Sequence, residues 1–154
     1  MTHHDIKLPK IGLTFSRAIM PQLGKTEDFL KQLDRHGIKY SHEKIHPKNL
    51  KASQSEFNYD AIRSLMTNPK KARSSVVISS DNHVVDGHHH FVASYNLDQE
   101  QKVIRVHLPI LDLINLVKKF PTTTYKTVDD VKSVRGILES IKTSVREKIK
   151  NTKY

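Results

Sequence analysis

Residues 79–95 read S-S-D-N-H-V-V-D-G-H-H-H-F-V-A-S-Y, and this stretch decides the fold that the sequence predicts. The sequence V-V-I-S at 76–79 indicates a strand, Asp81-Asn82 is typical of a two-residue turn, and residues 83–85 indicate a second strand. Three consecutive histidines after Asp86-Gly87 then open a predicted helix. Because the first N–H groups of a helix have no intrahelical partner, a strand-to-helix turn of this kind suits phosphate or metal binding.

The hydrophobic patterns before and after residues 79–95 predict an α/β (α+β) domain. This domain is expected to have a small mixed sheet flanked by helices, and a C-terminal helical arm. Period-two alternation indicates strands, and apolar spacing of three or four residues indicates helices. Residues 50–56 show neither pattern and are expected to be irregular. The other expected elements are a helix capped by Thr26 and stopped by Gly37, a strand at 38–45, a helix capped by Asn58, a strand at 102–108, and helices after Pro109 and Thr127.

The chain of 154 residues is long enough for one compact domain, and the changes in sequence pattern divide it into three segments. Residues 1–37 form an N-terminal lead-in with one helix. Residues 38–108 form the expected ligand-binding core, and residues 109–154 form a C-terminal helical extension. This division does not predict an oligomeric state.

Composition favours a cytoplasmic protein with a polyanionic partner. No stretch approaches 18 apolar residues, the N-terminus lacks the apolar segment of a signal peptide, and there is no cysteine. No membrane association is therefore expected. The net charge of +10 and the pI of about 9.8 favour a nucleotide or DNA as partner. A solvated basic surface that only aids solubility is the alternative.

Two motifs in the core resemble the signature boxes of the ParB/sulfiredoxin superfamily, in its phage-type form with a D-G-H-H-x box. The first box is I-H-P-K-N-L-K-A-S-Q-S-E at residues 45–56, and the second is V-V-D-G-H-H-H-F-V-A at residues 84–93. The resemblance covers residues 44–108, under half of the chain. It implies a nucleotide-binding domain that carries out phosphoryl transfer or phosphate-ester hydrolysis, as nuclease-like members do, on a nucleotide or a nucleic acid. ATP or CTP with Mg²⁺ is the expected cofactor.

The resemblance also implies roles for individual residues. Glu56 matches an acidic residue that acts as a general base in kinase members, and His88 and His89 match the two histidines of the commoner second box. Asp86 would orient the loop or bind magnesium, and Gly87 would let the backbone approach a phosphate. The implied catalytic residues are Glu56, His88 and His89, and the implied phosphate-binding residues are Gln54, Ser55, Asp86, Gly87, His88, His89 and His90.

One position departs from the family pattern. His90 stands where the family usually has arginine, whose permanent charge grips phosphate through a bidentate fork. Histidine carries at most part of that charge near neutral pH, so strong triphosphate binding is in doubt. The absence of cysteine excludes sulfiredoxin chemistry.

Alternatives remain open for the function and for several residues. A non-catalytic nucleotide- or DNA-binding module and a structural or inhibitory protein that reuses the fold are the competing functions. The alternative roles are a transition-metal site at His83 and His88 to His90, a helix N-cap at Asp86, a solvated first-turn acid at Glu56, and Arg105 and His107 either lining the pocket or facing solvent. Successive helical residues point about 100° apart, so three histidines in a row cannot all face one ion.

Overall fold

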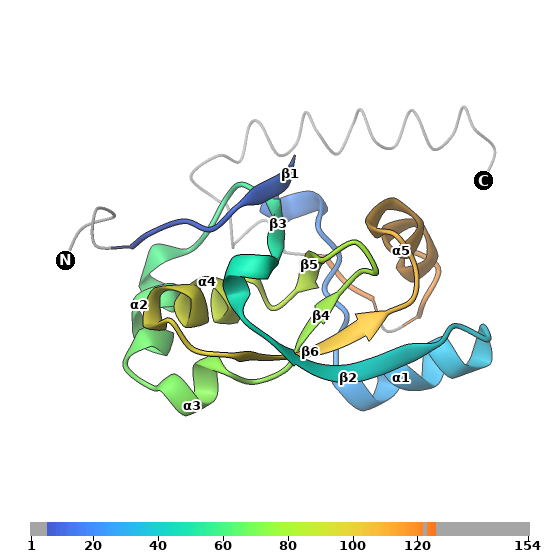
Figure 1. Ribbon diagram of the computed structural model, residues 1–154. Coiled ribbons are helices and arrows are strands. Elements are labelled where there is room, and N and C mark those ends of the chain that lie inside the picture. The colour runs from blue at the N-terminus through green and yellow to red at the C-terminus, as the bar shows by residue number, and fades with distance from the viewer. Residues whose placement is uncertain (1–5, 122, 126–154) are drawn as a thin grey trace, which may run out of the picture.

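The computed structural model describes residues 6–121 and 123–125, which form a central mixed sheet with helices packed around it (Figure 1). The six strands lie in the order β1-β3-β5-β4-β6-β2. They are β1 (Ile11–Phe15), β2 (Tyr40–Ile45), β3 (Lys51–Gln54), β4 (Val76–Ile78), β5 (His83–Asp86) and β6 (Gln101–Val106). The α-helices are α1 (Thr26–Arg35), α2 (Tyr59–Met66), α3 (Pro69–Ala72), α4 (His88–Leu97) and α5 (Ile110–Val117), and two 3-10 turns are η2 (Arg17–Ile19) and η3 (Pro47–Asn49).

The strand directions bring three chain segments to one edge of the sheet. β1 pairs with β3 and β3 pairs with β5, and both pairings are parallel. β4 is antiparallel to β5 and parallel to β6, and β2 closes the far side antiparallel to β6. The carboxyl ends of β1, β3 and β5 therefore meet at the same edge, which is where ligands commonly bind in sheets with parallel strands.

Each face of the sheet carries its own apolar core. On one face, α2, α3 and α4 cover a cluster that includes Ile62, Val76 and Phe91, all 0–1% exposed. On the other face, α1 and α5 cover a cluster that includes Phe29, Ile104 and Leu113, also 0–1% exposed. Figure 1 shows these two groups of helices on opposite sides of the sheet. Burial of these side chains supplies the main driving force for folding.

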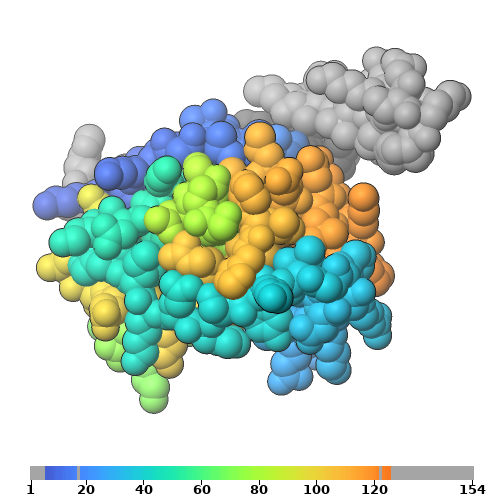
Figure 2. Space-filling view, turned by 45° about the vertical axis from the view of Figure 1, so that its right-hand side comes forward, coloured from blue at the N-terminus to red at the C-terminus, as the bar shows by residue number. Residues whose placement is uncertain are grey.

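The turn between β4 and β5 organises the opposite edge of the sheet. Asn82 adopts φ 65, and its Oδ1 accepts a 2.6 Å hydrogen bond from Arg105 Nη1. Asp81 Oδ1 accepts a 3.1 Å bond from the backbone N–H of Ile110, the first residue of α5. The aspartate thus caps a helix whose own N-cap, Pro109, makes no side-chain bond. Figure 2 shows this turn in light green at the surface, next to the orange segment of β6 and α5.

The structure confirms the mixed α+β class and most of the predicted elements. The strand–turn–strand–helix unit of residues 76–97 is present, as are the helix capped by Asn58 and the helix after Pro109. The predicted irregular segment at 50–56 is wrong, because residues 51–54 form β3 between β1 and β5. Thr26 is the first residue of α1 and Lys25 is its N-cap, so the predicted Thr26 cap is also wrong.

The segment before residue 38 contributes more than one helix. Its β1 is an edge strand of the sheet, and η2 follows it directly. The helix predicted after Thr127 lies outside the described residues. Within the described part of the chain, no helix has the length and apolar character needed to cross a membrane.

Candidate functional site

The two boxes of the sequence lie together at the sheet edge formed by the carboxyl ends of β1, β3 and β5. The first box leaves the sheet after Gln54 at the end of β3, and the second leaves it after Asp86 at the end of β5. Since β3 and β5 are parallel neighbours, both boxes exit at the same edge. The loop at residues 55–58 and the start of α4 are thereby brought side by side.

His88 is the buried link between the boxes. Its side chain is only 4% exposed, and its Nε2 accepts a 3.0 Å hydrogen bond from the backbone N–H of Ser53 in β3. A nitrogen that accepts such a bond carries no proton, so the ring is neutral with its proton on Nδ1. Burial, with a smaller contribution from His89, lowers the pKa of His88 to about 3. The ring therefore stays neutral through the physiological range and is poorly suited to donate or take up a proton there.

His89 makes a second link of the same kind. Its Nε2 accepts a 2.9 Å hydrogen bond from the backbone N–H of Asn58, whose own side chain caps α2 through a 3.0 Å bond from Ala61 N. The ring of Phe57 packs beside both histidines, with ring-centroid distances of 6.3 Å to His88 and 6.5 Å to His89. We use the name histidine clasp for His88 and His89 together with the backbone N–H groups of Ser53 and Asn58, from which the two rings accept hydrogen bonds.

Gly87 begins α4 in a conformation that favours glycine. Its φ is 91 and its ψ is 28, and it is the N-cap of α4 without a side-chain hydrogen bond. A Cβ at this position would lie 2.7 Å from Cγ1 of Val76 in β4. Backbone conformation and packing against Val76 are therefore sufficient to require glycine here, without any contact to a phosphate. The predicted phosphate contact of Gly87 stays a prediction.

His90 occupies the third position of α4 and is half-buried. Burial, with a smaller contribution from the positive charge of Lys71, lowers its pKa. The first turn of α4 contains no acidic residue, so its N-terminal partial charge is not offset by its own side chains. An anion placed here would meet a helix N-terminus, but it would meet a largely neutral His90 rather than the usual arginine.

The side chains of the first box differ in their exposure to solvent. Gln54 is 5% exposed, and its Nε2 donates a 2.7 Å hydrogen bond to the backbone carbonyl of Glu56. Ser55 and Glu56 are exposed, and the Ser55 hydroxyl lies 3.4 Å from the carbonyl of Thr14 in β1. Glu56 lies two residues before the N-cap Asn58, so the alternative that it is a first-turn helix acid is wrong. Gln54 shapes the loop that presents Glu56.

Asp86 ends β5 and is half-buried, so the alternative that it is the N-cap of α4 is wrong. Within residues 6–121 and 123–125, no group of three His, Asp or Glu side chains could hold a metal ion. The rings of His88 and His89 instead accept bonds from two different residues, in line with the expected 100° between them. Magnesium commonly uses one or two carboxylates together with substrate phosphates, and the magnesium role of Asp86 stays a prediction.

Arg105 and His107 lie away from this site. Arg105 Nε donates bonds of 3.0 and 3.2 Å to the two carboxylate oxygens of Glu43. Hydrogen bonds from Ser41 and Arg105 lower the pKa of Glu43. His107 is exposed beyond the end of β6, and its Nε2 lies 3.4 Å from the Ser41 hydroxyl. Both side chains belong to the edge with the β4–β5 turn, so they do not line the candidate site.

Ser16 is a residue of this edge that sequence reasoning missed. It follows β1 directly, and its hydroxyl oxygen is buried without a hydrogen-bond partner among the described residues. A buried hydroxyl without a partner is uncommon and costs stability. No motif in the sequence singles out Ser16, because its position depends on β1 pairing with β3.

Comparisons of the chain with protein-family models, with curated proteins and with solved structures gave no match.

Proposed function

We propose that the chain is a nucleotide-binding domain of the ParB/sulfiredoxin type, which carries out phosphoryl transfer or phosphate-ester hydrolysis on a nucleotide or nucleic acid. The observation that carries the proposal is the meeting of the two boxes at the carboxyl ends of parallel strands. Ser53 and His88 are 35 residues apart in the chain, yet they are joined by a buried 3.0 Å hydrogen bond. Such an edge, with a helix starting at a glycine, suits phosphate binding.

In this proposal the phosphates of ATP or CTP lie against the first N–H groups of α4. Asp86 would hold the Mg²⁺, which would offset the negative charge of the phosphates. Glu56 is exposed on the adjacent loop and would act as the general base. The clasp places this loop against α4, since His89 accepts a bond from Asn58, two residues after Glu56. In this proposal His88 and His89 act as positioning residues, and the lowered pKa of His88 makes that ring unsuited to carry a proton.

A non-catalytic binding module is the second candidate, and one observation favours it. The Nε2 atoms of His88 and His89 are both occupied by backbone N–H groups, and burial lowers the pKa of His90. The start of α4 therefore offers little fixed positive charge of its own to stabilise a transition state for phosphoryl transfer, which depends mainly on positioning and charge neutralisation.

Nucleotide binding is tested by calorimetric titration with ATP and CTP, with and without magnesium, on the parent and two variants at one position. His90→Arg adds a permanent charge and should tighten binding by about 1.5–3 kcal/mol. His90→Asp places an acid in the first turn, which favours the helix but repels phosphate, and it should weaken binding. Equal affinities in all three proteins would place the phosphates elsewhere.

Catalysis is tested through Glu56. If Glu56 is the base, Glu56→Gln should lower magnesium-dependent turnover by on the order of 10²-fold and leave nucleotide affinity equal or tighter. Glu27→Gln is a matched control, because it makes the same change at an exposed glutamate of α1, outside the candidate site, and it should retain turnover within a few-fold. If the parent binds nucleotide but turns over neither nucleotide nor nucleic acid, the binding-module function replaces the enzyme.

A further inference from the structure

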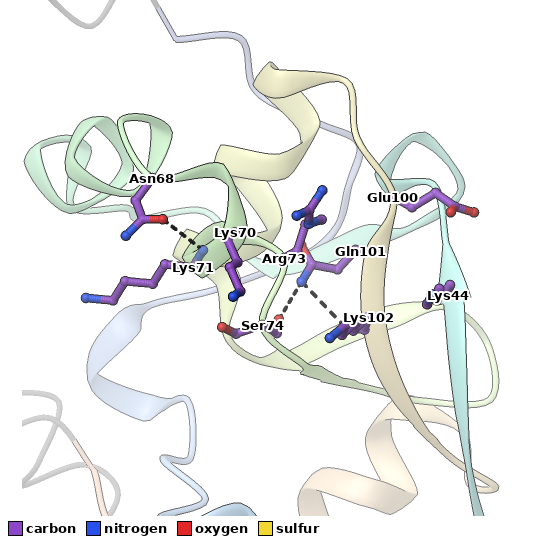
Figure 3. Close-up of a pocket in the computed structure, with 9 residues that line it drawn as sticks. All are labelled: Lys44, Asn68, Lys70, Lys71, Arg73, Ser74, Glu100, Gln101 and Lys102. Carbon is purple, nitrogen blue, oxygen red and sulfur yellow. Dashed lines mark hydrogen bonds between the residues drawn. The ribbon is translucent and has the colours of Figure 1, made fainter.

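A basic hollow lies on the β2–β6 side of the sheet, next to the end of α4. One of its cations, Lys71, also lies close enough to His90 in the first turn of α4 to lower the pKa of that ring. Its volume is about 760 Å³, and it is open to solvent. Figure 3 shows that its side chains come from three segments: α3 with the loop after it, the start of β6, and the end of β2. The lining residues are Lys44, Asn68, Lys70, Lys71, Arg73, Ser74, Glu100, Gln101 and Lys102.

The cations of this hollow are not neutralised by the described part of the fold. Five of the lining residues are basic and only Glu100 is acidic. None of the five makes an ion pair with a carboxylate in residues 6–121 or 123–125, and neither does Glu100. Among the described arginines and lysines, Arg63 pairs with Asp60, at 2.8 Å, and Arg105 pairs with Glu43, at 3.0 Å. The hollow is distinguished not by the lack of pairing but by having five cations around one space. The hollow therefore concentrates positive charge.

The backbone that carries these cations is fixed by hydrogen bonds, although the side chains are exposed. Gln101 is fully buried and its Nε2 donates a 2.5 Å bond to the carbonyl of Ser74, which ties the loop after α3 to the start of β6. The N–H of Lys102 donates to the carbonyl of Arg73 at 3.4 Å. At the other end of α3, Gln99 Nε2 donates a 2.9 Å bond to the carbonyl of Pro69. The backbone positions that carry the cations are thereby fixed before a ligand arrives.

The lining chemistry narrows the ligand class. No aromatic residue lines the hollow, so there is no platform on which a nucleobase could stack. Four of the five cations are lysines, which bind phosphate as point charges without a fixed geometry. We infer that the hollow binds the sugar–phosphate backbone of a nucleic-acid duplex, without reading its sequence, at a surface separate from the proposed nucleotide site.

Such binding has a specific salt dependence. Each phosphate that a cation neutralises releases condensed counterions, and the slope of log K against log salt is about −0.9 for each phosphate on B-DNA. Loss of three cations should therefore make the slope less negative by about 2.7. Because the contacts are to the backbone, two duplexes of unrelated sequence should bind within about three-fold of each other.

The test is fluorescence anisotropy of a labelled 20-base-pair duplex titrated with the full chain at several salt concentrations. The variant combines Lys70→Gln, Arg73→Gln and Lys102→Gln and retains Lys71, whose charge acts on His90. The matched control combines Lys25→Gln, Lys31→Gln and Arg35→Gln, which removes the same residue types from exposed positions around α1. We expect at least ten-fold weaker binding and the shallower slope in the variant, and near-parental binding in the control.

Three results would overturn the inference. The first is a variant with the parental slope and affinity, and the second is a control that weakens binding as much as the variant does. The third is competition at matched ionic strength: if Mg–ATP or polyglutamate displaces the labelled duplex at a lower charge concentration than unlabelled duplex does, the hollow takes nucleotides or acidic protein instead. Nucleotide titration of the same variant separates this inference from the proposed function, because the two sites are expected to fail independently.

Discussion

The start of α4 and the basic hollow are both rich in polar groups, but they use those groups in opposite ways. At the start of α4, ring nitrogens of His88 and His89 accept bonds from backbone N–H groups of the first box. In the hollow, five exposed cations surround open space without a carboxylate partner among the described residues. The first region should contribute to folding stability, whereas the second should contribute to ligand binding alone.

This difference shows in which region a single substitution can test function without also changing the stability of the fold. Changes in the histidine clasp remove interactions of the folded state, so a loss of activity there is confounded with a loss of structure. Changes at exposed charges usually alter stability by less than about 0.5 kcal/mol. The predictions below test whether the two regions separate in this way.

The largest expected effect is an acid-induced loss of stability through His88. Its pKa is about 3 in the folded chain and about 6.5 when unfolded, so between these values the unfolded state binds more protons. Stability is therefore fully present above pH 6.5 and falls as the pH is lowered toward 3, by up to about 4–5 kcal/mol. Urea unfolding from pH 7 to 4 measures this loss. In His88→Ala the histidine contribution should disappear, and an unchanged pH dependence would contradict a neutral clasp.

At pH 7, His88→Ala should lower the free energy of unfolding by about 3 kcal/mol. The change leaves a cavity, and it leaves the buried N–H of Ser53 without a hydrogen-bond acceptor. His90→Ala is the matched control in the same turn of α4, since His90 is half-buried and should cost under about 1 kcal/mol. Denaturant unfolding compares the two. Similar losses from both variants would mean that His88 does not carry the clasp.

Gly87→Ala should cost about 2–3 kcal/mol, because φ 91 is unfavourable for alanine and the new Cβ would lie 2.7 Å from Val76 Cγ1. The double variant Gly87→Ala/Val76→Ala should remove the collision but retain the backbone strain. A double-mutant cycle by thermal unfolding should therefore give favourable coupling. If the stability losses of the two single variants simply add in the double variant, contact with Val76 is not the reason that residue 87 must be glycine.

Much of the region around α4 is predictable from the sequence, because its signals are local. Asp81-Asn82 marks the turn, Gly87 separates β5 from α4, and Asn58 caps α2 as expected. β1 and β3 were not predicted, for a physical reason. β3 is the short segment K-A-S-Q, whose burial depends on pairing with β1 and β5, so no local pattern marks it.

In the candidate site, too, some features could be predicted from the sequence and others depend on contacts between distant segments. The resemblance pointed to Glu56 and to the turn at residues 86–90, and the fold brings the two boxes to one edge. The clasp bonds could not be predicted, because they join residues 31 and 35 positions apart in the chain. The hollow was missed because its cations look like ordinary solvated charges until α3, β6 and β2 are placed side by side.

The smallest expected effect on stability is that of the combined Lys70→Gln, Arg73→Gln and Lys102→Gln variant. These side chains are exposed and lack carboxylate partners in the described residues, so the free energy of unfolding should change by less than about 0.5 kcal/mol per substitution. Removing mutual repulsion could even stabilise the fold slightly. A loss of several kcal/mol in the free energy of unfolding would show that the hollow stabilises the fold. It would then not differ from the clasp in this respect.

The most direct test of the proposed nucleotide site is a titration of the ¹⁵N-labelled chain with Mg–ATP and Mg–CTP, followed through backbone amide chemical shifts. The amides of residues 87–91 at the start of α4 and of residues 53–58 in the first box should shift most. Those of residues 69–74 and 101–102, which carry the hollow, should shift little. Shifts confined to the hollow, or no shifts at millimolar nucleotide, would contradict the account.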